Sequence, residues 1–191
     1  YIPILFHRAL LKILGVKVKL IGKKTLIRPL ILAGNHTSYI DIIILIDDAS
    51  NDATIEVAQS AAAQFEGGDK VKIISGKQLP SGWAGKVWAL QQGINNTTKK
   101  QAKYYLLSDA DVYHDTSNLT RLVTKAEKDE LDLVSLMVKL RCRSLWDWLL
   151  IPAFVFFFQK LFPFNSVNDS SSHVAAAAGG CMLVRKTAMD R

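Results

Sequence analysis

The chain has 191 residues, of which 49% are hydrophobic and 21% are charged, and its formal net charge is +7. This length and composition suit one α/β domain with a real core, and they exclude a disordered chain. The basic charge fits an anionic membrane surface or a phosphorylated substrate, but it is spread along the chain without a dense run of Lys and Arg, so nucleic acid is not expected as a partner.

Short apolar runs alternate with helical patterns along most of the chain. Strands are expected at residues 30–33, 42–46, 71–75, 104–107, 131–140 and 181–184. Three helices are expected between them, and the one at 85–95 is predicted to turn Val87, Leu90 and Ile94 inward. This alternation predicts a doubly wound, mostly parallel α/β sheet. In such sheets, ligands bind beyond the carboxyl ends of the strands.

The most apolar stretch covers residues 148–158 and is rich in aromatic side chains. It is shorter than the ~18 residues that a transmembrane helix needs. Two interpretations stay open: a helix lying in a bilayer interface, and a helix buried in the core.

Two aspartates follow the strand that ends at residue 107. Asp109 and Asp111 stand two positions apart, so their carboxylates can converge on one hard cation, and Mg²⁺ and Mn²⁺ prefer oxygen ligands. The plain alternative is a solvated turn with an aspartate capping the next helix. Further polar motifs follow other strands of the same sheet, and together they favour a Mn²⁺ or Mg²⁺ site.

The loop after residues 42–46 begins with Asp47 and Asp48. Both stand before Asp52 and Thr54, which are expected to cap the next helix, so their carboxylates can accept hydrogen bonds from a base or a ribose. Lys86 follows a glycine at another helix N-terminus, where N–H groups and one cation suit a phosphate. The alternative for Lys86 is a solvated surface lysine, and only the ordered set of three motifs favours a ligand site.

Residues 43–191 resemble the family 2 glycosyltransferases, and closely their hopanoid-associated, HpnB-like branch. The stretches that carry the resemblance are IDDAS at 46–50, GKQLPSGWAGKVWALQQG at 76–93, YLLSDADVYH at 105–114, LDLVSLMVKLRCRSLWDWLLIPAFVFFFQ at 131–159 and AAAAGGCMLVRKTAM at 175–189. The resemblance implies a Rossmann-like GT-A fold and an inverting, metal-dependent transfer from a UDP-sugar to a lipid acceptor. It also implies site roles: Asp47 and Asp48 near the nucleoside, Lys86 near the base or diphosphate, Asp109 at the ribose and with Asp111 at the metal, and Gly179 and Gly180 beside the acceptor.

Two parts of the family pattern are not expected in this chain. Members begin with a strand that ends in a Pro-x-x-Asn-Glu-like loop, which helps to hold the nucleotide, and that segment is missing here. Their acidic catalytic base lies beyond the last strand, and the sequence ends first, at Arg191. We therefore expect an incomplete fold with weak donor binding and negligible turnover. If the base lies within the chain, the candidates are Asp169 and Asp190.

Residues 1–45 resemble the opening of the PlsC-type glycerol-phosphate acyltransferases. In GNHTSYIDI at 34–42, His36 and Asp41 match the family's His-x4-Asp box, which implies His36 as a general base oriented by Asp41. A helix-capping turn is the alternative. The later boxes of that family are absent from the sequence, so the box is expected to be inert. The expected domains are an acyltransferase-like segment at 1–42 and a glycosyltransferase domain at 43–191.

Three functions remain open at this point. The first is glycosyl transfer at the cytoplasmic side of a bacterial inner membrane, by a chain that is peripheral or anchored through segments outside it. The second is a glycerol-phosphate acyltransferase of lipid biosynthesis. The third is a non-enzymatic module that binds a membrane surface, which the basic charge and the aromatic stretch favour.

Overall fold

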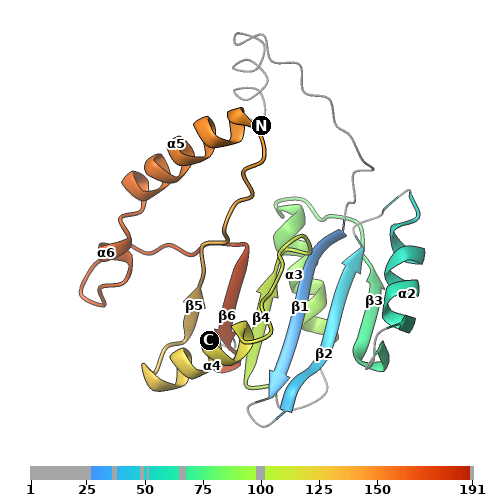
Figure 1. Cartoon of the computed structure of the whole chain (residues 1–191). Helices are drawn as coiled ribbons and strands as arrows, with labels where there is room; N and C mark the ends of the chain where they lie inside the picture. Colours follow the sequence, from blue (N-terminus) through green and yellow to red (C-terminus); the bar gives the residue numbers. More distant parts are fainter. Residues whose placement is uncertain are drawn as a thin grey trace.

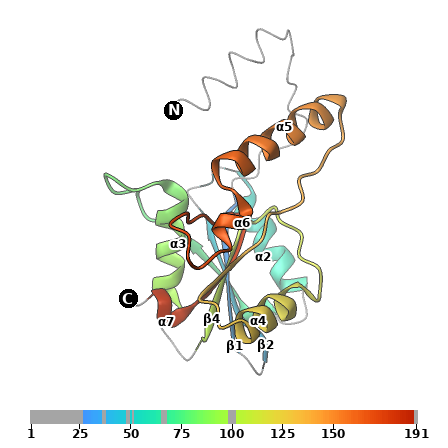
Figure 2. The ribbon, with the colours of Figure 1, turned by 90° about the vertical axis from the view of Figure 1, so that its left-hand side faces the viewer.

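The computed structural model describes residues 27–35, 38–47, 50, 52–64, 68–97 and 102–189, and at residues 27–35 and 38–41 it describes the backbone alone. The predicted α/β fold class is confirmed. In the described chain a single sheet is covered on both faces. Helices α3 (Gly85–Asn96) and α7 (Lys186–Met189) lie on one face, and α2 (Thr54–Gln64) and α4 (Asn118–Lys128) lie on the other (Figure 2).

The sheet contains six strands in the described chain, in the order β3-β2-β1-β4-β6-β5 (Figure 1). They are β1 (Ile27–Asn35), β2 (Ser38–Asp47), β3 (Val71–Ser75), β4 (Tyr104–Ser108), β5 (Leu133–Ser135) and β6 (Cys181–Arg185). The expected mostly parallel sheet is correct for strand direction, since β2, β3, β4 and β5 point the same way. It is wrong for strand pairing, because β1 and β6 run between them in the opposite direction and only β2 and β3 form a parallel pair.

The antiparallel pairing of β1 with β2 has a local cause. Only residues 36–37 separate these strands, and such a short connection can join antiparallel strands but not parallel ones.

The predicted long strand at 131–140 is also wrong. Its ladder to β6 covers only Leu133 to Ser135, which pair with Val184 and Met182 at their ends. Strand β6 begins at Cys181, and the Leu136 amide still donates to the Cys181 carbonyl at 2.9 Å, so the pairing ends there.

Strand β4 lies at the centre of the core and is buried over its whole length. Its alternate side chains point to opposite faces, as the pleat of a strand requires. Tyr104 and Leu106 pack in one cluster with α4, and Tyr105 and Leu107 pack in the other with α3 and β2. Helices α3 and α4, on opposite faces, are thereby held against one strand.

Helix α3 packs through small residues, and this corrects part of its predicted face. Ala89 and Gly93 are buried, and Leu90 and Ile94 pack beside the core cluster. Val87 is 53% exposed, although it was predicted to face inward. It stands two positions from Ala89, which is about 200° around the helix, so the two cannot face the same side.

One edge of the sheet gathers the strand ends that matter for the site. Because β1 is antiparallel to both β2 and β4, those two strands end at the same edge. Strand β6 begins there, with Cys181 opposite Ser108. With β1 between them, the ends of β2 and β4 are two inter-strand spacings apart, about 10 Å. The predicted gathering of strand-end motifs at one edge is confirmed for the described residues.

Helix α5 (Leu145–Leu161) lies beyond this same edge and projects away from the sheet (Figures 1 and 2). A capping box starts it: the Ser144 hydroxyl accepts from the Asp147 amide at 3.1 Å, and the Asp147 carboxylate accepts from the Ser144 amide at 2.9 Å. None of its residues is buried, so the core-helix interpretation is wrong. The short helix α6 (Phe164–Val167) follows it. Among the described helices, none has the length and apolar character needed to cross a membrane.

Candidate functional site

Lys86 and Asp109 form the centre of the candidate site. Lys86 lies in the first turn of α3, Asp109 directly follows β4, and their Nζ and Oδ1 atoms are 2.5 Å apart. The same Nζ donates a hydrogen bond to the Gly179 carbonyl at 2.9 Å. Both charged side chains are 39% exposed, so a ligand can reach them. The structure thus brings together three segments that the sequence proposed separately for donor and acceptor.

Gly180 lies directly against the start of the Asp109 loop. Its carbonyl accepts from the Asp109 amide at 3.1 Å and from the Ser108 hydroxyl at 3.3 Å. A Cβ atom at Gly180 would lie 2.8 Å from Cγ2 of Val138 and 3.9 Å from Oδ2 of Asp109. No ordinary Cβ contact is as short as the first of these distances. Glycine at this position therefore allows the chain just before β6 to pass close to Val138.

The His114 ring holds the start of the Asp109 loop through hydrogen bonds, and the sequence did not predict this role. One ring nitrogen is 2.7 Å from the buried Ser108 hydroxyl, and the other is 2.9 Å from the Asn118 amide nitrogen. Partial burial lowers the pKa of His114, which favours the neutral ring. His114 and Ser108 belong to the stretch YLLSDADVYH, but only the fold shows that they meet.

Asp47 is at the predicted edge, but its carboxylate is already engaged. The residue is 3% exposed, and its oxygens accept from the amide of Ser50 at 3.2 Å and from the Ser50 hydroxyl. This arrangement closes the βα loop after β2. A contact between Asp47 and a nucleoside stays a prediction, and Asp48 lies outside the described residues. Asp52 accepts from the amide and hydroxyl of Thr54, the capping role considered for it.

The loop that leads to Lys86 is anchored by residues that the sequence did not single out. The buried Gln92 accepts from the Lys77 amide at 2.6 Å, and the Trp88 indole donates to the Lys77 carbonyl at 3.1 Å. Trp83 packs edge-on against Trp88, with ring centroids 5.2 Å apart. These contacts fix the loop onto α3 and position Lys86 at the sheet edge.

The predicted metal ligands form a small oxygen-only set. Asp109 is paired with Lys86, and Asp111 is exposed two positions further on. No group of three or more potential metal-ligating side chains converges in the described part of the chain. Two carboxylates still fit Mg²⁺ or Mn²⁺, because Mg²⁺ commonly takes one or two carboxylates and completes its shell with phosphate oxygens and water.

The remaining candidates are placed only in part. His36 lies outside the described residues, and so does Asp190, while Asp41 is described by its backbone alone, in β2. Asp169 is exposed in the turn after α6, where its carboxylate accepts from the Ser171 amide at 2.9 Å and hydroxyl at 2.7 Å. These hydrogen bonds lower the pKa of Asp169, so it is ionised near neutral pH.

Comparison with known protein families gives a match over most of the chain. The model described as Glycosyl transferase family 2 covers residues 25–191. The chain belongs to this family. Family 2 glycosyltransferases have a GT-A, Rossmann-like fold and use a nucleotide-sugar donor and an acceptor. No curated protein and no solved structure matches the chain.

The family 2 match also bears on the first strands. It begins at residue 25 and so includes β1 and β2, which hydrogen-bond into the same sheet as β3 and β4. The positions of His36 and Asp41 fall inside this match. The acyltransferase-like segment and the domain boundary at residue 43 stay predictions, as does the HpnB-like branch.

Proposed function

We propose that this family 2 glycosyltransferase moves a sugar from a UDP-sugar to a hydroxyl group of a lipid acceptor, with inversion at the sugar carbon and with Mn²⁺ or Mg²⁺ at Asp109 and Asp111. The observation that carries the proposal is the meeting of Lys86, Asp109 and Gly179 at the sheet edge. This edge receives the ends of β2 and β4, which is where α/β sheets bind nucleotides.

Lys86 is the group that we assign to the donor diphosphate. Helix α3 has no side chain capping its N-terminus, so its first N–H groups and the Lys86 ammonium together favour a bound anion. The ion pair with Asp109 is weak in water, since exposed pairs contribute about 0–1 kcal/mol. A diphosphate can therefore draw Lys86 away at little cost. This movement would free the Asp109 carboxylate.

Asp109 and Asp111 would then hold the metal ion. When bound, the ion offsets negative charge on the diphosphate as it leaves. Lys86 acts in the same direction, because a fixed cation stabilises the charge that develops on the leaving group. Inversion requires the acceptor hydroxyl to attack from the face opposite the diphosphate, with its proton taken by a base. The Gly179–Gly180 turn is the acceptor side in this proposal.

A membrane surface is the proposed location of the acceptor, at the cytoplasmic side of a bacterial inner membrane. The support comes from α5, which has no buried residue and lies beyond the edge that carries the site. Its exposed side chains include Trp148, Phe154 and Phe157. Lys139, Arg141 and Arg143 precede it. Aromatic and basic residues together suit the interface of an anionic bilayer.

A metal-dependent binding measurement tests the proposal. Asp111→Asn should weaken UDP binding in Mn²⁺ about tenfold or more, the range expected when a charged contact of 1.5–3 kcal/mol is lost. In EDTA the variant and the natural chain should bind alike. Asp115→Asn is the matched control, because Asp115 is an exposed aspartate whose carboxylate accepts from Ser117. An equal loss under both conditions would contradict the metal role, and absence of UDP binding by the natural chain would contradict the donor assignment.

A further inference from the structure

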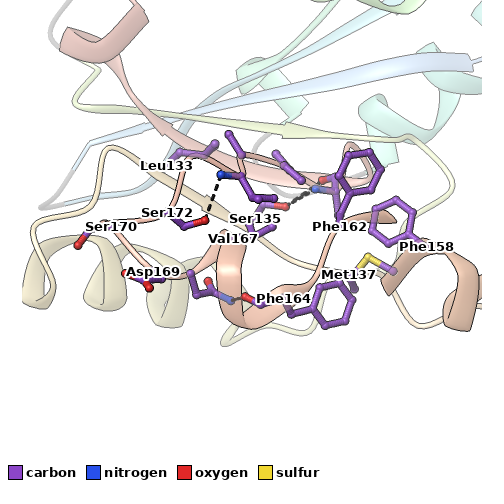
Figure 3. A pocket seen from close by; sticks show the side chains of 16 residues that line it. Leu133, Ser135, Met137, Phe158, Phe162, Phe164, Val167, Asp169, Ser170 and Ser172 are labelled. Carbon is purple, nitrogen blue, oxygen red and sulfur yellow. Dashed lines mark hydrogen bonds between the residues drawn. The ribbon is translucent and has the colours of Figure 1, made fainter. Parts of the chain in front are cut away.

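A cavity of about 490 Å³ lies beside the segment that leads into Gly179 (Figure 3). Its size is within the range of small-molecule sites, ~300–1,000 Å³. Residues 174–178 form one wall, and the end of α5, helix α6 and the chain around β5 form the others. The large apolar side chains that line it are Leu133, Met137, Phe158, Phe162, Phe164 and Val167.

The aromatic wall of the cavity is a packed group. Phe158 contacts Phe162 with ring centroids 5.3 Å apart and Phe164 with centroids 6.4 Å apart. These rings come from α5, from the residue after it and from α6. The cavity thus has a mostly apolar lining with defined aromatic surfaces, as sites for the apolar part of a ligand usually have.

The opposite wall connects the cavity to the candidate site. Ser135 of β5 holds this wall through Ala178: its hydroxyl accepts from the Ala178 amide at 2.6 Å and donates to the Ala178 carbonyl at 3.2 Å. Ala178 lines the cavity. The next residue, Gly179, accepts the hydrogen bond from Lys86. One peptide step therefore separates the cavity from the ion pair.

The polar residues of the cavity restrict the head group that it can accept. Asp169, Ser170 and Ser172 line one side, and the Ser172 hydroxyl accepts from the Val174 amide at 3.1 Å. The hydrogen bonds from Ser171 lower the pKa of Asp169, so this side of the cavity carries a negative charge at neutral pH. A carboxylate or phosphate group is repelled by this charge, whereas a neutral hydroxyl is not.

We propose that this cavity holds the apolar part of a neutral, hydroxylated amphiphile and presents its hydroxyl toward the Lys86–Asp109 pair. The proposal rests on the proposed function, because it names the chemical class of the acceptor for that same site. It goes beyond the proposed function because it assigns the contacts with the apolar part of the ligand to β5, α6 and residues 174–178.

The test compares n-decanol with decanoate by isothermal titration calorimetry. The natural chain should bind decanol and bind decanoate at least about tenfold more weakly, a difference of 1.4 kcal/mol. Ala176→Phe fills the cavity, which Ala176 lines, and should weaken decanol binding about tenfold or more. The matched control is Ala61→Phe, at an exposed alanine of α2. Asp169→Asn should strengthen decanoate binding and leave decanol binding unchanged.

UDP binding in Mn²⁺, measured on the same samples, separates the two proposals. Ala176→Phe should bind UDP as the natural chain does, which also shows that it is folded. If Ala176→Phe does not fold, Val167→Phe, in the opposite wall, replaces it. Decanol binding that survives cavity filling, no decanol binding by the natural chain, or equal binding of decanoate would each overturn the cavity assignment. If the natural chain binds decanol but does not bind UDP, only the proposed function is overturned.

Discussion

Strand β4 and helix α5 are both made mainly of large apolar residues, yet their surroundings differ completely. In β4 all five residues are buried, and in α5 none of the seventeen is buried. Strand β4 has a hydrogen-bonded strand on each side and a helix against each face. Helix α5 follows an extended segment that leaves the sheet where β6 begins. Burial is therefore decided by the neighbours that the chain path supplies.

The comparison also separates two uses of apolar surface. Around β4 it stabilises the fold, because burial removes about 25 cal/mol of unfavourable hydration per Å². On α5 the same kind of surface contributes little to folding and stays available to a second phase or a ligand. The predictions below test this difference, from the largest expected effect to the smallest.

Two leucine substitutions give the sharpest contrast. Leu183→Ala, in β6 at 1% exposure, should lower the free energy of unfolding by about 2–5 kcal/mol, because it leaves a cavity in a packed core. Leu149→Ala, in α5 at 62% exposure, should change it by at most about 0.5 kcal/mol. Urea unfolding followed by circular dichroism measures both. Similar losses would mean that α5 is part of the cooperative fold.

Two adjacent glycines test the close packing of the chain before β6 on Val138. Gly180→Ala should destabilise by about 1–3 kcal/mol, because its Cβ would overlap with Val138 and force the packing apart. Gly179→Ala is the matched control, since its Cβ would meet only Lys86 Nζ, at an ordinary 3.5 Å. The thermal unfolding midpoints of the two variants measure this difference in stability. Equal unfolding midpoints would show that the packing between position 180 and Val138 can accommodate a Cβ atom.

His114 predicts a smaller, pH-dependent effect near β4. Burial places the pKa of His114 in the folded state below its ordinary value of 6.5, so the unfolded chain binds this proton more readily. The contribution of neutral His114 to the free energy of unfolding is complete above pH 6.5. It decreases as the pH falls toward the folded-state pKa of His114. His114→Gln should flatten that part of the pH profile of the unfolding midpoint. An unchanged profile would exclude His114 as the source.

The smallest effect on stability is expected for Phe157→Ser in α5, where the ring is 64% exposed. Stability should change by about 0.5 kcal/mol or less. Binding to phosphatidylglycerol vesicles, measured by co-sedimentation, should fall. Tyr113→Ser is the control, because Tyr113 is 92% exposed and lies outside α5. Unchanged vesicle binding by Phe157→Ser would contradict the interfacial role of this helix.

The sequence alone predicted the α/β class, the positions of most helices and strands, and the motifs that meet at one edge. These features depend on local patterns: the 2-residue and 3.6-residue periods of apolar residues, and polar residues at strand ends. The motif order also led to family 2, which the match over residues 25–191 confirms. The Lys86 and Asp109 motifs were found in this way, though not their contact.

Other features depended on the tertiary structure, because they arise between segments far apart in the chain. Strand pairing was mispredicted for β1 and β6, since an apolar run does not record the direction of its neighbour. The engagement of Asp47 by Ser50 and the support of Ser108 by His114 require loop geometry that residue types do not specify. The exposure of α5 could not be read from its composition, because an apolar helix is buried only where other elements cover it.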